Sequence, residues 1–226
     1  DYASGTSSRS TKLIHGGLRY LKNFEFKLVR EVGKERAVVY NIAPHLVVPE
    51  KMLLPLVEGG SFGKFGTGIG LWLYDKLAGV TGEDKRKILS KGKTLEIEPT
   101  LRNDILKGAG YYAEYRTDDA RLTLEIIKTA VQLKATAINY TAATELVYEN
   151  KIITGVKCID AITKTPFSIK AKKIVNATGP WVDELREKDK SLSEKKLHLT
   201  KGVHIVVNRD KLPINNSIYS MSKEEE

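Results

Sequence analysis

The chain has 226 residues, of which 41% are hydrophobic and 29% charged, a composition that excludes an intrinsically disordered protein and allows a sizeable core. It shows no apolar run long enough to cross a bilayer, no secretory leader and a single cysteine, Cys158, so we expect a cytoplasmic protein without an internal disulfide. The net charge of +9 is compatible with an anionic substrate or an anionic membrane surface, whereas the scattered basic runs lack interleaved aromatic residues, which makes nucleic acid the least favoured partner.

The first element is the run SGTSSRSTKLIHGGLRYL, residues 4–21, which combines small hydroxyl side chains, a glycine pair and ionisable side chains. Serine and threonine offer hydroxyls and backbone N–H groups, Gly16 and Gly17 let the backbone approach a flat ligand, and Arg19 can bind a carboxylate or phosphate with two hydrogen bonds. His15 and Arg19 lie on one face if a helix begins here. The run therefore predicts a binding segment for an anionic ligand and is more than a serine-rich helix start.

Residues 24–78 predict a helix, an extended segment and a second helix. Apolar residues recur at helical spacing among charged ones over residues 24–42, and this helix stops before Pro44. Residues 44–55 are rich in branched and long apolar residues, which is typical of an extended strand. A glycine-dense loop then leads into an apolar helix near residues 69–77, and its GTGIG spacing does not match a phosphate-binding loop.

The second half begins with a helix and then changes to strands. Thr117-Asp118-Asp119 is a strong N-cap signal for a helix that continues to Val131, and we interpret both aspartates as capping residues rather than catalytic ones. After Lys134 the pattern alternates as in strands. We expect the first run to join a parallel sheet, the later ones to form an antiparallel meander, and the final KKIVNATG to return to the parallel sheet. The runs are residues 136–149, 151–161 and 166–177.

Small residues close the last of these runs. Ala177, Thr178 and Gly179 would let the backbone lie against a dinucleotide, because open α/β sheets bind their ligands at the carboxyl ends of the strands. We give Trp181, which follows them, no role beyond packing.

Four separate segments resemble, in the same order, segments of the FAD-dependent glycerol-3-phosphate dehydrogenases and the related alpha-glycerophosphate oxidases. These segments are residues 4–21, 111–122, 174–185 and 199–207. The resemblance implies an α/β fold in which residues 1–21 and 115–185 form the distal part of an FAD-binding doubly wound domain. Residues 22–114 and 186–226 would then form a mixed α+β substrate or cap region, truncated at its end.

The resemblance also implies which residues contact the ligands. His15 would lie near the flavin ring and His204 would point at the carbon that is oxidised, so these two are the predicted catalytic residues. Arg19 and Tyr20 would line the pocket for glycerol phosphate, and no metal ligand is predicted. The predicted FAD contacts are Thr6, Ser7, Ser8, Ser10, Lys12, Leu13, His15, Gly16, Thr144, Ala177, Thr178 and Gly179, with Thr144 on the adenine side.

The implied reaction is the oxidation of sn-glycerol 3-phosphate to dihydroxyacetone phosphate by hydride transfer to FAD, while a base takes the hydroxyl proton. Quinone and oxygen both remain open as electron acceptors, and the family's dehydrogenases are peripheral proteins on the inner face of the cell membrane. Two alternatives stay open. They are another FAD-dependent amine or hydroxy-acid oxidoreductase of the same fold and a catalytically inactive basic binding module.

The sequence lacks the Gly-x-Gly-x-x-Gly turn with which doubly wound nucleotide-binding domains begin. We therefore expect an internal fragment of a longer enzyme, without its first nucleotide-binding unit and without part of the substrate site. Because the pyrophosphate would lose the backbone donors of that turn, we expect the 226-residue chain by itself to carry no stoichiometric FAD and to be inactive.

Overall fold

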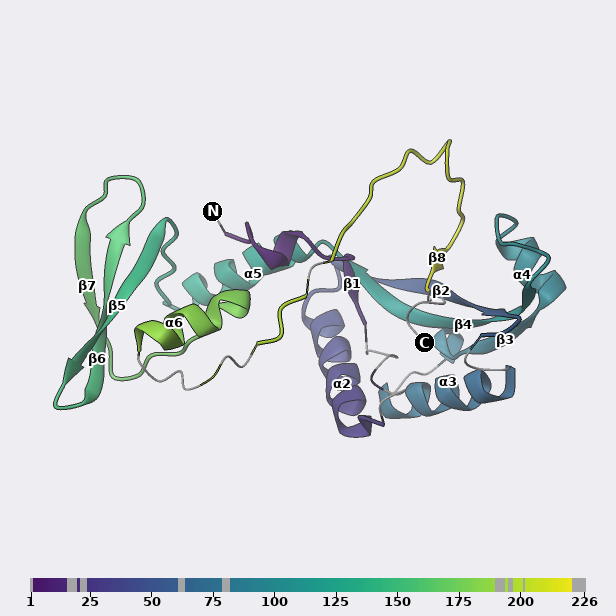
Figure 1. Cartoon of the computed structure of the whole chain (residues 1–226), viewed down its shortest axis with the longest axis horizontal. Helices are drawn as coiled ribbons and strands as arrows, with labels where there is room; N and C mark the ends of the chain where they lie inside the picture. Colours follow the sequence, from purple (N-terminus) through teal and green to yellow (C-terminus); the bar gives the residue numbers. More distant parts are fainter. Residues whose placement is uncertain are drawn as a thin grey trace. The chain divides into compact units, whose positions relative to one another are not determined.

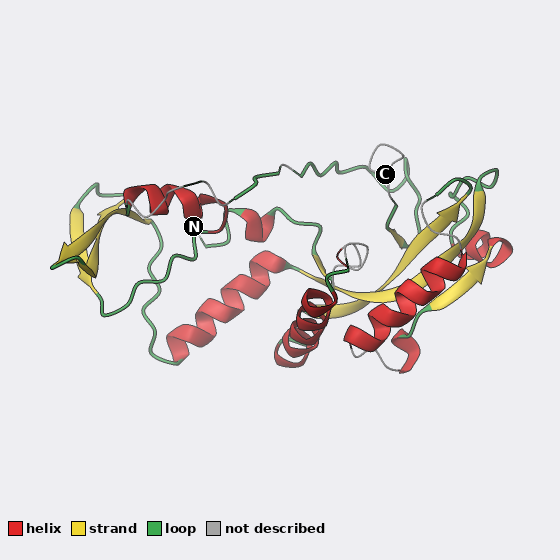
Figure 2. Cartoon of the chain, turned by 60° about the horizontal axis from the view of Figure 1, so that its bottom comes forward, coloured by secondary structure: helices red, strands yellow, loops and turns green. Residues whose placement is uncertain are grey.

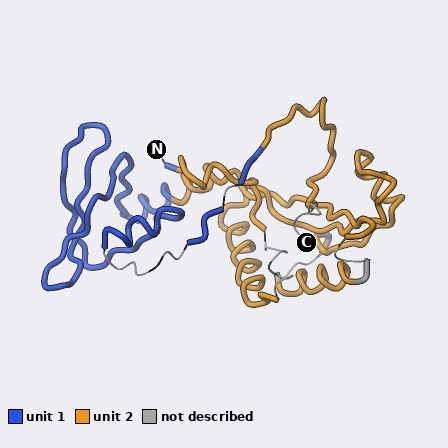
Figure 3. Tube along the Cα trace, in the orientation of Figure 1, with its two compact units in different colours: residues 1–2, 127–204 blue, residues 3–126, 205–226 orange. Residues whose placement is uncertain are grey.

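The computed structural model describes residues 2–15, 20, 24–60, 64–78, 82–189, 194, 197–200 and 202–220. The chain divides into two compact units, one of residues 1–2 and 127–204 and a larger one of residues 3–126 and 205–226 (Figure 3). The domain boundaries that the sequence predicts stay a prediction. Within the described residues, no helix combines the length and the apolar character needed to pass through a membrane.

The larger unit is built on two long antiparallel strands, β2 and β4, whose ladder extends from Val47 opposite Thr117 to Val57 opposite Leu106. Strands β1 and β3 pair antiparallel with β4, and β8 pairs parallel with β2. This unit therefore contains a mixed sheet with β4 and β2 at its centre. Its strands are β1 (Leu13–Ile14), β2 (Val47–Val57), β3 (Lys87–Ser90), β4 (Leu106–Thr117) and β8 (Ser217–Ile218).

Two helices, α2 (Phe26–Ile42) and α3 (Lys64–Ala78), lie on the same side of this sheet (Figures 1 and 2). Helix α3 comes close to β4 at Gly110, where an added Cβ would lie 2.6 Å from a methyl carbon of Leu71. Glycine at this position therefore permits the approach of the helix to the sheet. The buried core that results contains Val29, Met52, Leu71, Tyr74 and Tyr112.

A buried carboxylate fixes the segment that leads into β8. Glu98 follows the short helix α4 (Lys91–Ile97) and accepts the backbone N–H groups of Asn215 at 2.7 Å and Asn216 at 3.0 Å. Burial by itself would raise the pKa of Glu98, but the hydroxyl of Thr100 and these two N–H groups lower it below its usual range. The C-terminal segment is thereby tied to the sheet. Two 3₁₀ turns, η1 (Thr6–Ser8) and η2 (Gly82–Asp84), complete this unit.

The smaller unit contains an antiparallel three-stranded sheet in the order β5-β6-β7. The end of α6 meets β5, because the backbone oxygen of Asp189 accepts the Tyr148 hydroxyl at 3.5 Å. The boundary between the two units falls within helix α5: its residues up to Ile126 belong to the larger unit and the rest to the smaller one. The elements are α5 (Asp119–Gln132), β5 (Thr141–Glu149), β6 (Ile152–Asp160), β7 (Pro166–Lys170), η3 (Gly179–Trp181) and α6 (Val182–Lys188).

The predicted helix 24–42, the extended segment 44–55, the helix after Asp118 and the three strand runs are confirmed as elements. Helix α3 begins at Lys64, earlier than predicted, and includes glycines that were expected in a loop. The burial of Thr67 and Leu71 gives the physical reason, since tertiary packing outweighs the low helix propensity of glycine.

The predicted return to a parallel sheet is wrong within the described residues. Strand β5 pairs antiparallel with β6, and residues 171–178 form no strand. A strand needs a neighbour that takes up its backbone hydrogen bonds, and the sheet of this unit ends at β5 and β7 in the part of the chain that is described. Residues 202–207 are irregular as well.

We expect Gly155→Ala to destabilise the chain by about 1–3 kcal/mol, the usual cost of overpacking. A Cβ at Gly155 in β6 would lie 2.5 Å from the carbonyl oxygen of Ile169 in β7, so the ladder must shift to admit it. Urea unfolding of the 226-residue chain measures the effect. The control is Gly92→Ala in α4, where a Cβ meets no atom within 4 Å and unfolding should not become easier. Equal stability of the two variants would contradict the prediction.

Candidate functional site

The backbone of residues 10–14 is attached to the end of β4. Leu13 and Ile14 form β1 and pair with Arg116 and Tyr115. The carbonyl oxygen of Lys12 accepts the N–H of Thr117 at 2.9 Å. The predicted ligand-binding segment therefore extends from the sheet of the larger unit, next to the start of α5.

Asp119, the first residue of α5, binds the side chains of this segment. The Ser10 hydroxyl donates to its Oδ2 at 2.6 Å, and the Lys12 ammonium forms an ion pair with its Oδ1. Lys12 Nζ also donates to the carbonyl oxygen of Ser8 at 3.2 Å. Although partial burial raises the pKa of Asp119, the hydrogen bonds from Lys12 and Ser10 lower it below its usual range. The carboxylate is thus held in its charged form.

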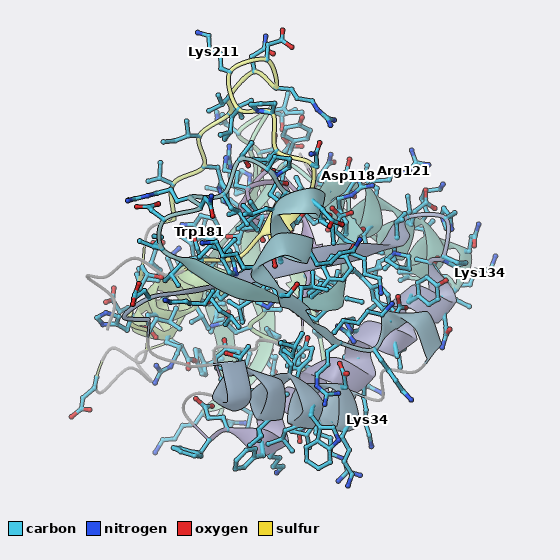
Figure 4. The ribbon with its side chains drawn as sticks, turned by 90° about the vertical axis from the view of Figure 1, so that its right-hand side faces the viewer. Lys34, Asp118, Arg121, Lys134, Trp181 and Lys211 are labelled. Atoms are coloured by element: carbon cyan, nitrogen blue, oxygen red, sulfur yellow. The ribbon has the colours of Figure 1, made fainter. Side chains whose placement is uncertain are left out.

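Asp118 caps α5. Its Oδ1 accepts the N–H groups of Ala120 at 3.1 Å and Arg121 at 3.2 Å, and Figure 4 shows Asp118 and Arg121 side by side. The capping interpretation is confirmed for Asp118, whereas the carboxylate of Asp119, in the first turn of α5, also binds Ser10 and Lys12. Sequence spacing could not reveal this, because the two partners lie 109 and 107 positions away.

A buried ion pair, with a tyrosine hydroxyl, connects β4 to the two helices α2 and α3. Arg36 of α2 donates to Glu114 of β4 at 2.6 Å, and the hydroxyl of Tyr74 in α3 donates to the other carboxylate oxygen at 2.6 Å. Tyr115 stacks on Tyr40 with ring centroids 4.9 Å apart and also faces the guanidinium. Burial lowers the pKa of Arg36, but Tyr74 and Glu114 together raise it above its usual value. The local sequence pattern does not reveal this cluster, because Arg36, Tyr74 and Glu114 lie on three separate elements.

The predicted contacts in the larger unit differ in what their side chains do. The exposed hydroxyls of Thr6 and Ser7 form no hydrogen bond with another described residue, whereas Ser8 Oγ donates to the carbonyl oxygen of Gly5 at 3.1 Å. Leu13 is half-buried in β1, and His15 and Tyr20 are exposed. Gly16 and Arg19 lie outside the described residues, and with them the helical face that His15 and Arg19 were expected to share.

In the smaller unit, Asn176 organises the turn that contains the predicted contacts. Its Oδ1 accepts the hydroxyl of Thr178 at 2.7 Å and the N–H of Thr178 at 3.3 Å, while its Nδ2 donates to the carbonyl oxygen of Val182 at 3.1 Å. Gly179 has a φ of +57° and open space where a Cβ would be. Ala177 is exposed. Sequence analysis missed Asn176, although an asparagine two residues before a threonine is a signal for such a turn.

Two further predicted residues belong to the smaller unit. Thr144 lies inside β5 at a change of register, and its hydroxyl donates to the carbonyl oxygen of Lys157 at 3.1 Å. Because Thr144 lies in a β-bulge, its side chain hydrogen-bonds to the neighbouring strand β6. His204 is exposed in an irregular segment, and its predicted role stays a prediction.

Each unit contains hydroxyl or backbone groups of the kind that bind anionic ligands. In the larger unit, the hydroxyls of Thr6 and Ser7 have no partner in the described chain. In the smaller unit, the backbone of Gly179 has a positive φ, which residues other than glycine rarely adopt, and no atom lies within 4 Å of where a Cβ would be. Hydroxyl and amide donors suit phosphate and ribose oxygens. In the same described parts, no three His, Cys, Asp or Glu side chains gather into a group that could hold a metal ion.

Comparison with known proteins identifies the relatives of the chain. Residues 1–224 match the sequence profile of the family described as FAD dependent oxidoreductase (DAO). The aerobic glycerol-3-phosphate dehydrogenase of Staphylococcus aureus strain USA300 is 55% identical over 220 residues, which are 97% of this chain and 40% of that enzyme. The chain thus spans less than half the length of this relative.

Solved structures agree with this result. The glycerol-3-phosphate dehydrogenase of Bacillus halodurans complexed with FAD is 45% identical, with a TM-score of 0.62 over 84% of this chain and 30% of that chain. The L-alpha-glycerophosphate oxidase of Mycoplasma pneumoniae with FAD bound, 20% identical, has a TM-score of 0.58 over 82% of this chain and 47% of its own. The second likeness shows the fold alone.

We expect Glu114→Gln to lower the free energy of unfolding by about 3–5 kcal/mol, because it leaves the buried Arg36 charge without its counter-charge. Tyr74→Phe is the matched comparison. It removes the hydrogen bond to the same carboxylate and the one that the hydroxyl accepts from Arg36, but it leaves the two charges paired and should cost only about 1–3 kcal/mol. Urea unfolding of both variants ranks them, and a smaller loss in Glu114→Gln than in Tyr74→Phe would contradict the prediction.

Proposed function

The chain belongs to the family of FAD-dependent oxidoreductases, and from this premise we propose that it acts as part of an FAD-dependent glycerol-3-phosphate dehydrogenase. The observation that carries the proposal is the high identity, over almost the whole chain, to the staphylococcal enzyme of that name. The reaction would oxidise sn-glycerol 3-phosphate to dihydroxyacetone phosphate. Quinone or oxygen would accept the electrons, and the basic surface would meet anionic lipid at the membrane.

FAD, when bound, supplies a two-electron acceptor that no protein side chain can replace. The residues that would hold it include Thr6 and Ser7 in the larger unit, whose hydroxyls have no partner among the described residues. In the smaller unit they include the turn at Thr178 and Gly179, which Asn176 orders. Ser8, Ser10 and Lys12 would contribute through the conformation of their segment, because their side chains already bind protein groups.

The chain's own side chains would bind the substrate and move its proton. The planar guanidinium of Arg19 suits the substrate phosphate through two parallel hydrogen bonds, and Tyr20 would line the same pocket. The substrate must lose a hydride from C2 and a proton from the C2 hydroxyl. His15 and His204 are the proposed residues for this chemistry, because a neutral imidazole can accept a proton near neutral pH.

The function is tested with the protein expressed from the complete reading frame that contains this sequence. Under anaerobic conditions, glycerol 3-phosphate should bleach the flavin absorbance of the purified protein, and amino acids should not. Bleaching by an amino acid instead would assign the chain to the amine-oxidising members of the fold. A protein whose flavin responds to neither substrate, or that binds no flavin, would contradict the proposal and favour a basic binding module.

We expect Arg19→Ala to raise the KM for glycerol 3-phosphate about 30-fold, equivalent to roughly 2 kcal/mol of lost binding to a charged group. The kcat should change much less, because the phosphate is bound in both the ground state and the transition state. Arg19→Lys keeps the charge but cannot form two parallel hydrogen bonds, so its KM should lie between that of the wild type and that of Arg19→Ala. Steady-state kinetics measures both constants, and an unchanged KM in Arg19→Ala would remove Arg19 from the pocket.

A further inference from the structure

Asp119 connects the start of α5 to the predicted FAD-binding segment, residues 4–15. One carboxylate oxygen accepts the hydroxyl of Ser10 at 2.6 Å and the other accepts the ammonium of Lys12. We infer that Asp119 is a positioning residue for FAD, which holds this segment through Ser10 and Lys12 in its binding conformation. The inference rests on the proposed function, and it assigns to Asp119 a role different from the capping role of its neighbour Asp118.

The Ser10 hydroxyl shows how the carboxylate orders the segment. Ser10 Oγ donates its only proton to Asp119 and accepts the N–H of Lys12 at 3.0 Å. Because the proton is directed at the carboxylate, a lone pair of the hydroxyl is left to face the Lys12 N–H. The resulting local turn is of the kind that serine side chains form with the backbone two residues later. Without the carboxylate, the hydroxyl is free to rotate and the turn loses its orientation.

Lys12 is the second point of attachment. It is a non-glycine residue with a φ of +63°, a conformation that L-residues adopt at a cost and that therefore needs support from its surroundings. That support comes from three sides. The backbone carbonyl oxygen accepts from Thr117, and the ammonium binds both Asp119 and the carbonyl oxygen of Ser8. The ion pair with Asp119 thus stabilises the turn that carries the chain from the segment into β1.

Asp119 acts on the cofactor only through these partners. Each of its two oxygens already accepts a hydrogen bond from the segment, and its side chain is only 19% exposed. The hydroxyls that the segment leaves without a partner among the described residues include those of Thr6 and Ser7, on the exposed turn η1. The role of the carboxylate is therefore to hold the segment, while other groups of the segment would touch FAD.

The test compares Asp119→Asn with Asp118→Asn in the protein expressed from its complete reading frame. Both variants remove one negative charge at the same helix end, and asparagine remains a good cap at Asp118. We expect Asp119→Asn to weaken FAD binding about 10-fold or more, measured by titrating the flavin-free protein with FAD and following flavin fluorescence. The Asp118→Asn control should stay within about twofold of the wild type, and thermal unfolding of the flavin-free variants should be similar.

A second measurement needs no flavin. In the flavin-free protein, hydrogen exchange at the amide of Lys12 should be faster in Asp119→Asn than in Asp118→Asn, because only the first change frees the Ser10 hydroxyl. Lys12→Met combined with Asp119→Asn should weaken FAD binding by less than the sum of the two single changes, since both remove the ion pair between Lys12 and Asp119.

The outcomes separate the inference from the function on which it rests. If the wild type binds FAD and Asp119→Asn binds it equally well, or if Asp118→Asn weakens binding as much, the inference is overturned and the proposed function stands. Additive losses in the double variant would also overturn it. If the wild type binds no FAD at all, the proposed function fails and the positioning role fails with it.

Discussion

The buried ion pair between Arg36 and Glu114 is the interaction on which the larger unit depends. Two charges are placed where water does not reach them, which costs several kcal/mol per ion unless hydrogen bonds replace the lost hydration. Tyr74 and the carbonyl oxygen of Ala113 provide such bonds, but Arg36 Nε remains without a partner in the described parts of the chain. The pair therefore specifies one arrangement of α2, α3 and β4 more than it adds stability.

That arrangement continues along β4 into the candidate site. Within residues 111–122, Tyr112 packs in the core, Glu114 binds Arg36, Asp118 caps α5 and Asp119 holds Ser10 and Lys12. A single short stretch thus fixes the helices, begins a new helix and attaches the predicted cofactor-binding segment. Because Asp118 and Asp119 follow β4 directly, a shift of β4 would displace the segment as well.

The smaller unit is constructed differently. Its described hydrophobic residues are largely exposed, and only Cys158 among them is buried. Its order depends on the β5-β6-β7 ladder and on local hydrogen bonds such as those of Asn176. Apolar side chains such as Tyr148, Ile152 and Trp181 remain exposed on it. The predicted contacts Thr178 and Gly179 are therefore positioned by turn geometry, whereas the segment that carries those in the larger unit is attached to β4 and to Asp119.

The sequence by itself determined the local elements and the family. Helical spacing located α2, the Thr117–Asp119 cap located α5, and alternation located β5 to β7, because each of these signals depends on neighbours within a few residues. The four motifs indicated the family correctly. The tertiary structure alone decided that Glu114 meets Arg36, that Asp119 binds Ser10 and Lys12, and that residues 171–178 form no strand. These contacts join groups that are tens to more than a hundred residues apart in the sequence. The local pattern of a chain does not indicate which distant groups come together.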